Sequence, residues 1–180
     1  MNIHPLFVHF PIGMLVVYSV LEIGAYFLPA LRRQSWLFPV KTFLLLVGVL
    51  AAFAALVTGG ITEGILKEEA DPNFFMVETH SSFAAATTIL YIILAGAYLI
   101  RVFDQNGWGD RIAGTNNLLI RLWNWKKKGA HVVLDTWLLP VLALVALVGM
   151  FVTGALGAAI VYGPDEDPFI TFVYHLFWAE

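Results

Sequence analysis

The chain has 180 residues, of which 59% are hydrophobic and only 13% charged, and its formal net charge is −3. A soluble domain carries about a quarter charged residues, so this composition excludes an ordinary water-soluble globule as well as a charge-rich disordered chain. The net charge provides no basic field for nucleic acid, and the absence of cysteine excludes disulfides, thiolate metal sites and c-type haem attachment.

What remains is a small integral membrane protein, and four segments have the length of a transmembrane helix. Such a helix needs about 20 mainly apolar residues to cross about 30 Å of hydrocarbon. The segments are residues 6–28, 42–62, 81–100 and 136–162. Since the first has no basic stretch before it and no small-residue cleavage site, we do not interpret it as a removable signal peptide. We expect a single membrane domain over residues 1–180, folded as an all-α four-helix bundle.

Two further apolar segments are too short to span a membrane. Residues 116–128 interleave leucine and tryptophan with Arg121 and three lysines, which is typical of an amphipathic helix in the headgroup layer. Residues 168–179 follow an acidic run that ends at Asp167, and Pro168 suits the first turn of a helix. Because about eleven helical residues reach only about 16 Å, we expect this short helix on the outer surface or folded back over the bundle.

The basic residues predict the orientation of the chain. Nine of the ten follow the first or the third span, and Lys67 alone lies on the opposite side. The nine are Arg32, Arg33, Lys41, Arg101, Arg111, Arg121, Lys126, Lys127 and Lys128. Since basic loops stay in the cytoplasm, we expect a multi-pass protein of the bacterial inner membrane with both termini in the periplasm.

This topology gathers most of the histidines on one side. His4, His9, His80 and His175 fall on the outer side, whereas His131 lies on the cytoplasmic side beside the lysines. Pro11 interrupts backbone hydrogen bonding near His9, and irregular backbone at membrane depth is tolerated only inside protein or around a cavity. We therefore expect the face of His9 to line the bundle interior, with Glu22 pointing away from it. That face comprises His9, Gly13, Val16, Val20 and Gly24.

Small residues cluster at the same depth on the other spans. They are Thr58-Gly59-Gly60, Ala84-Ala85-Ala86, and Gly149, Thr153 and Gly157 at four-residue spacing. Such residues let helix backbones pack closely, which is one interpretation. The other is that they leave room between facing histidines for a flat ligand, as a b-type haem in a four-helix bundle requires.

Two other polar groups are candidates. Glu22 is an acid within the first span, which is costly unless it is protonated, paired or functional, and it is near enough to the inner interface to reach water or Arg32. A transition metal is an alternative at the outer side, where imidazoles and carboxylates meet and methionine would suit copper. The candidate ligands are His4, His80, His175, Glu78, Asp71, Met14 and Met76. No hydrolytic triad, phosphate loop or dinucleotide motif is present.

The start of the chain carries a resemblance. The run His4-Pro5-Leu6-Phe7-Val8-His9-Phe10-Pro11-Ile12-Gly13 resembles the hallmark of a family of small bacterial membrane proteins of unknown function. The resemblance covers most of the chain, implies four helices, and includes His80 and the Gly-rich fourth span up to Tyr162. Relatives commonly carry a further histidine just after that point, whereas here the next one is His175. Similar domains are found joined to c-type cytochrome modules, which implies an association with respiratory electron transfer.

We therefore hypothesise a membrane electron-transfer subunit, not an enzyme on its own, that binds haem b non-covalently near the periplasmic face. His9 and His80 each begin a span and are the expected axial ligands of the haem iron. His4 and His175 are further candidates, for a second haem or for contacts to the haem propionates. The expected partners are lipid, c-type cytochromes or a respiratory complex, and further copies of the chain. A structural or assembly subunit of a larger membrane complex is the alternative, and a periplasmic-side metal binder is a second.

Overall fold

The computed structural model describes residues 4–69 and 74–178, and this part of the chain contains eight helices and no strand. Four of the helices are long: α1 (His4–Phe27), α3 (Leu37–Glu68), α4 (Phe74–Gln105) and α7 (Leu138–Tyr162). The shorter ones are α2 (Pro29–Arg32), α5 (Trp108–Ala113), α6 (Asn117–Leu134) and α8 (Pro168–Phe177).

The four long helices are each long and apolar enough to cross a membrane, in α1 from Phe7 to Phe27. The chain is thus an all-α integral membrane bundle, as expected from the composition. Two of the helices exceed the expected spans, since α3 begins five residues before residue 42 and α4 begins seven before residue 81. Pro39 lies in the first turn of α3, where its missing N–H has no helical partner to lose.

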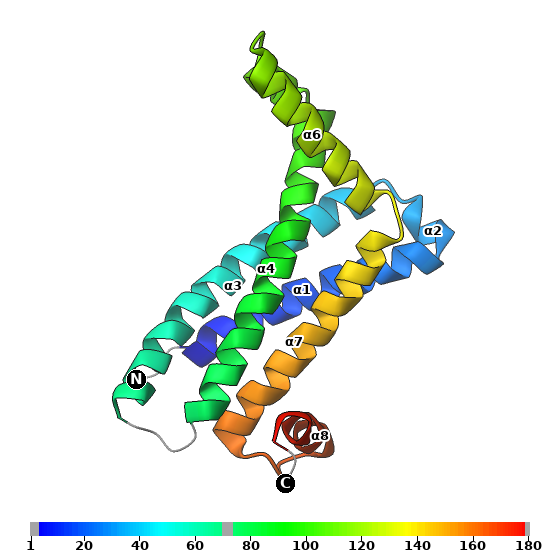
Figure 1. Ribbon diagram of the computed structural model, residues 1–180. Helices are drawn as coiled ribbons and strands as arrows, with labels where there is room; N and C mark the ends of the chain where they lie inside the picture. Colours follow the sequence, from blue (N-terminus) through cyan, green and yellow to red (C-terminus); the bar gives the residue numbers. More distant parts are fainter. Residues whose placement is uncertain (1–3, 70–73, 179–180) are drawn as a thin grey trace.

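The long helices form a closed ring in which α1 packs against α3 and α7, and α4 packs against the same two helices (Figure 1). Large side chains fill the middle of the ring, among them the fully buried Leu15, Leu45 and Leu94. Apolar side chains also cover the outside, for example Leu50 and Phe53, each more than half exposed. An exposed apolar belt is what a lipid-facing surface requires.

The helix α1 continues without a break through Pro11, so the irregular backbone expected near His9 is not seen. The face of α1 that enters the bundle carries Leu15, Tyr18 and Glu22. His9, Gly13 and Val20 are exposed on the other side, which corrects the expected orientation. The reason is that α1 is apolar on both faces, so its sequence pattern does not distinguish lipid from protein.

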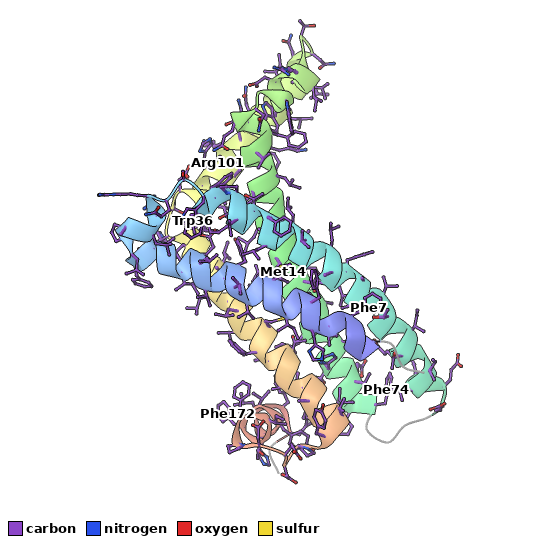
Figure 2. All side chains as sticks on the ribbon, turned by 180° about the vertical axis from the view of Figure 1, so that it is seen from behind. Phe7, Met14, Trp36, Phe74, Arg101 and Phe172 are labelled. Atoms are coloured by element: carbon purple, nitrogen blue, oxygen red, sulfur yellow. The ribbon has the colours of Figure 1, made fainter. Side chains whose placement is uncertain are left out.

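The bundle has two chemically different ends, and Figure 2 separates them. Phe7, Phe74 and Phe172 lie at one end, and Trp36 and Arg101 lie at the other. We call the first the histidine end, because α1 begins there with His4, His80 lies two turns into α4, and α8 carries His175. We call the second the basic end, which comprises the α1–α3 connection with Arg32, the first turns of α3 with Lys41, and the α4–α6 region with Arg101.

Helix α8 lies across the histidine end, where it packs against α7 through the buried Ile170 and Val173 (Figure 1). Its N-cap is Asp167, whose carboxylate accepts hydrogen bonds from the backbone N–H groups of Phe169 and Ile170. This local capping explains why the acidic run before Pro168 begins a helix. Helix α8 is thus held against α7 at this end of the bundle.

At the basic end, α4 extends beyond the other long helices and α6 packs against it (Figure 1). Asn116 caps α6 by accepting from the N–H groups of Leu118 and Leu119. Lys127 of α6 pairs with Asp104 of α4 at 3.3 Å and with Asp110 of α5 at 3.4 Å. The segment predicted to lie in the headgroup layer therefore has one face against α4, while Leu118 and Trp125 remain exposed on it.

Candidate histidine site

His4 and His80 come together at the histidine end. His4 begins α1, and its ring reaches across to α3, whereas His80 lies two turns into α4 and reaches α7. His4 and Glu63 of α3 both lie within electrostatic range of the His80 imidazole. Side chains from α1, α3 and α4, with the backbone of α7, therefore meet in one place.

The His80 ring has a defined tautomer. Its Nδ1 lies 3.0 Å from the backbone carbonyl oxygen of Thr153. Because a carbonyl oxygen only accepts, Nδ1 must donate the proton, and the lone pair of the neutral ring is then on Nε2. In the part of the chain that the structure describes, Nε2 of His80 makes no hydrogen bond. A Nδ1–H bond to a carbonyl is how proteins orient histidines that ligate a metal through Nε2.

The His4 ring is held in the same manner. Its Nδ1 lies 3.1 Å from the Thr58 hydroxyl oxygen, and that hydroxyl donates its single hydrogen to the helix carbonyls of Ala54 and Ala55. With its hydrogen on one of these carbonyls, the Thr58 oxygen is able to accept a hydrogen bond from Nδ1 of His4. Burial lowers the pKa of His4, and a hydrogen bond to the Ala55 carbonyl opposes this shift only in part. The neutral, ligating form is thus favoured near neutral pH.

Glycines make room for both rings. A Cβ atom on Gly59 would lie 3.0 Å from Cε1 of His4, and one on Gly157 would lie 3.0 Å from Cε1 of His80. Side chains rarely pack so closely, so each ring uses space that an alanine would take. The small residues predicted to surround the histidines thus do so at Thr58-Gly59 on α3 and at Thr153 and Gly157 on α7. Gly149 instead packs against Thr87 of α4.

The other two histidines of this end do not join the pair. His9 is exposed on α1, on the side opposite the buried Tyr18. Five residues separate it from His4, which rotates it by about 140° around a helix. His175 is exposed on α8, where its ring contacts that of Tyr174. The sequence predicts His9, rather than His4, as the partner of His80. In the structure it is His4 that lies near His80, whereas His9 is exposed on α1.

The residues proposed for a tertiary metal site are also dispersed. No group of three His, Asp or Glu side chains able to hold a metal ion occurs in residues 4–69 and 74–178. Glu78 is exposed, Met76 is buried in the packing of α4, and Met14 packs beside Gly48 of α3. Asp71 lies outside the described residues.

A second buried polar cluster lies at the basic end, and of its members the sequence singles out only Glu22. Glu22 of α1 is 3% exposed, and both its carboxylate oxygens lie 2.9 Å from Nζ of Lys41, which is 8% exposed. The Tyr98 hydroxyl of α4 donates to the same carboxylate. The partner of Glu22 is therefore Lys41, not Arg32 or water, because α3 begins early enough to place Lys41 inside the bundle.

Aromatic rings enclose this charged pair. Phe38 stacks on Tyr98 with ring centroids 5.4 Å apart, and Nζ of Lys41 lies 5.9 Å from the Tyr98 ring centre. Deeper in the bundle, the Ser19 and Tyr91 hydroxyls are 2.9 Å apart, and the Tyr18 ring packs edge-on against Tyr91 and Tyr98. The position of Lys41 in the sequence is the signal that points to this role: it comes two residues after Pro39 and immediately before an uncharged span.

Residues 1–164 match the family described as "Predicted membrane protein (DUF2231)". The chain belongs to this family. The suspected membership in a family of uncharacterised small membrane proteins is thus confirmed. No curated protein and no solved structure matches the chain.

The family match includes three of the four histidines predicted on the outer side and excludes the fourth. His4, His9 and His80 lie within the residues shared with the DUF2231 family, as do all four long helices. Helix α8 and His175 lie after residue 164, beyond the match. The His4–His80 pair therefore lies within the part of the chain that matches the family.

Proposed function

We propose that this DUF2231 protein is a membrane electron-transfer subunit that holds a b-type haem at the histidine end, with His4 and His80 as the axial ligands. The observation that supports the proposal is the shared anchoring of the two rings. His80 donates from Nδ1 to the Thr153 carbonyl of α7, which leaves its lone pair on Nε2, the atom through which imidazole ligates haem iron, and Nδ1 of His4 lies 3.1 Å from the Thr58 hydroxyl of α3. Two ligands suffice for a haem, whereas a bare metal ion in a protein needs three or more.

The donor set fits this cofactor in its chemistry. Both rings are neutral imidazoles, and small residues on α3 and α7 border them. Bound between them, a haem supplies one-electron transfer at its iron. The chain's own part is to fix the two rings through Thr58 and the Thr153 carbonyl, and to surround the site with apolar helices. These roles position and insulate a redox group and require no catalytic residue.

The orientation of the chain belongs to the same proposal. Lys and Arg are concentrated at the basic end, and basic connections stay in the cytoplasm. We infer a bacterial inner-membrane location with the histidine end towards the periplasm. A redox partner such as a c-type cytochrome or a respiratory subunit would then exchange electrons at that end.

The test is the absorption spectrum of the full chain purified in detergent from cells supplied with haem precursors. We expect a Soret band and a low-spin reduced-minus-oxidised difference spectrum. His80→Ala and His4→Ala should each abolish the low-spin signal, since each removes one axial ligand. His9→Ala and His175→Ala are matched controls and should retain it, because both residues are exposed and apart from the pair.

Two results would overturn the assignment. A folded protein without any Soret band would exclude the haem, and equal loss in His9→Ala would exclude the His4–His80 pair. A folded, colourless protein that co-purifies stoichiometrically with other membrane subunits would instead support the alternative of a structural or assembly subunit. The α4–α6 projection, with its exposed Leu118, Leu122 and Trp125, favours that alternative as a contact surface.

A further inference from the structure

A pocket of about 290 Å³ opens at the basic end, far from the histidine pair. Five helices or their ends contribute to it, and it combines charged, polar and aromatic side chains. Its lining residues are Arg32, Gln34, Leu37, Phe38, Lys41, Tyr98, Arg101, Leu134, Asp135 and Leu139.

The pocket carries an excess of positive charge. Arg32, Lys41 and Arg101 line it, against the single carboxylate of Asp135. Glu22 binds Lys41 and adds a second carboxylate to the group. Three cations therefore face two carboxylates, and one positive charge remains uncompensated. Within the described part of the chain, Arg32 makes no ion pair. Gln34, which also lines the pocket, is neutral.

Arg101 has unused hydrogen-bonding capacity here. One of its terminal nitrogens, Nη2, lies 2.6 Å from the Asp135 carboxylate. Its Nε atom is buried and has no hydrogen-bond partner among the described residues. A buried N–H without an acceptor is costly, so an acceptor that enters the pocket would relieve that cost. A guanidinium suits the oxygens of a phosphate in particular.

Lys41 lines the pocket, and its ammonium group is already paired. It is held by Glu22 and lies over the Tyr98 ring, which is stacked on Phe38. Lys41 is therefore buried, whereas Arg32 of the same pocket is exposed. Basic pockets between transmembrane helices commonly bind the headgroups of anionic lipids.

We propose that this pocket binds a phosphate-bearing anion, with Arg32 and the Nε of Arg101 as the principal donors. The phosphate group is the shared chemistry of two sources, an anionic phospholipid headgroup and free inorganic phosphate. The inference is independent of haem binding, because the pocket and the histidine pair lie at opposite ends of the bundle.

The experiment is native mass spectrometry of the full chain in detergent, titrated with phosphatidylglycerol. We expect Arg32→Gln and Arg101→Gln to weaken binding by about tenfold each, as expected for loss of one charge-assisted hydrogen bond. Arg33→Gln is the matched control: Arg33 is the exposed neighbour of Arg32, does not line the pocket, and should change binding by less than about twofold. Asp135→Asn should strengthen binding, since it removes the competing carboxylate.

Two further measurements distinguish the lipid headgroup from free inorganic phosphate as the ligand. Diacylglycerol, which lacks the phosphate, should not bind at this site. Displacement of phosphatidylglycerol by millimolar inorganic phosphate would identify a free phosphate as the ligand, and failure to displace it would identify the lipid. Equal losses in Arg32→Gln and Arg33→Gln, or diacylglycerol binding as strong as phosphatidylglycerol binding, would overturn the proposal. Arg32 is exposed and unpaired in the described chain, so its variant is expected to fold even if Arg101→Gln does not.

Discussion

The two ends of the bundle hold polar side chains in different ways. At the basic end, the buried Glu22 carboxylate is matched by the Lys41 ammonium and the Tyr98 hydroxyl, so opposite charges neutralise one another within the protein. At the histidine end, the His4 and His80 rings are neutral and are anchored through Nδ1 to a hydroxyl and a carbonyl.

The difference indicates what each cluster is suited to do. A charged pair with every strong partner in place holds α1, α3 and α4 together and has little capacity for another ligand. Two anchored imidazoles that lie close together are suited to ligation. The Glu22–Lys41 pair should therefore respond to mutation mainly through stability, and the His4–His80 pair through ligand binding.

The largest expected effect is on the Glu22–Lys41 pair. Lys41→Met removes the ammonium and leaves a buried carboxylate uncompensated, which costs about 3–5 kcal/mol in buried pairs. The measurement is the free energy of unfolding in mixed micelles, or the thermal midpoint in detergent. Lys67→Met is the matched control, because Lys67 is exposed near the end of α3 and makes no ion pair in the described residues.

The double variant Glu22→Leu with Lys41→Met refines this prediction. Replacing both partners by apolar groups removes the desolvation cost of each, so most of the lost stability should return. If Lys41→Met is no less stable than Lys67→Met, the pair is not structural, and the contrast between the two ends fails.

The sequence predicted the number of spans and the separation of the two ends, because both follow from strong signals. Hydrophobic length identifies a transmembrane helix directly, and an even number of spans returns the chain to the side where it began. The capping residues were readable as well: Asp167 before Pro168 specified the start of α8. These features depend on local chemistry or on simple counting.

Helix rotation was not predictable, and this determined the choice of histidine. In a soluble helix a polar face identifies the exposed side, but α1 is apolar towards both lipid and protein. His9 was therefore assigned to the interior, although it is exposed. The partner of Glu22 was missed for a related reason, since the early start of α3 that brings Lys41 into the bundle depends on packing with α1 and α4.

A smaller effect is expected at the histidine end when space is removed beside a ring. Gly157→Ala places a Cβ 3.0 Å from Cε1 of His80, which forces the ring to move, whereas Gly154→Ala meets nothing within 4 Å. Both variants gain the same helix propensity, so the difference between them isolates the crowding. We expect Gly157→Ala to be less stable than Gly154→Ala by about 1–3 kcal/mol.

The same pair of variants tests the ligand role. If His80 ligates haem, Gly157→Ala should also shift the Soret band or lower the haem content, while Gly154→Ala should leave both as in the wild type. Equal stability and equal spectra in the two variants would show that the His80 ring moves freely, contrary to a preformed site.

The smallest expected effect comes from the half-exposed ion pair of Arg101 and Asp135 at the basic end. Partial burial acts to raise the pKa of Asp135, but hydrogen bonds and charge from Arg101 and His131 outweigh it and hold the pKa below its ordinary value of 3.8. A carboxyl whose folded-state pKa is depressed contributes stability above its unfolded pKa and loses that contribution as the pH falls through the folded one. The loss should therefore begin only below about pH 4.

Because Asp135 is 49% exposed, solvent screens the interaction, and its contribution should not exceed about 1 kcal/mol. The measurement compares the thermal midpoints of the wild type and Asp135→Asn at pH 6 and pH 3. We expect the wild type to be slightly more stable at pH 6, with a smaller advantage at pH 3, where protonation of Asp135 begins to remove the interaction. A difference as large as that caused by Lys41→Met would mean that exposure does not weaken the Arg101–Asp135 pair. Burial would then not be what distinguishes the Glu22–Lys41 pair from the charges around it.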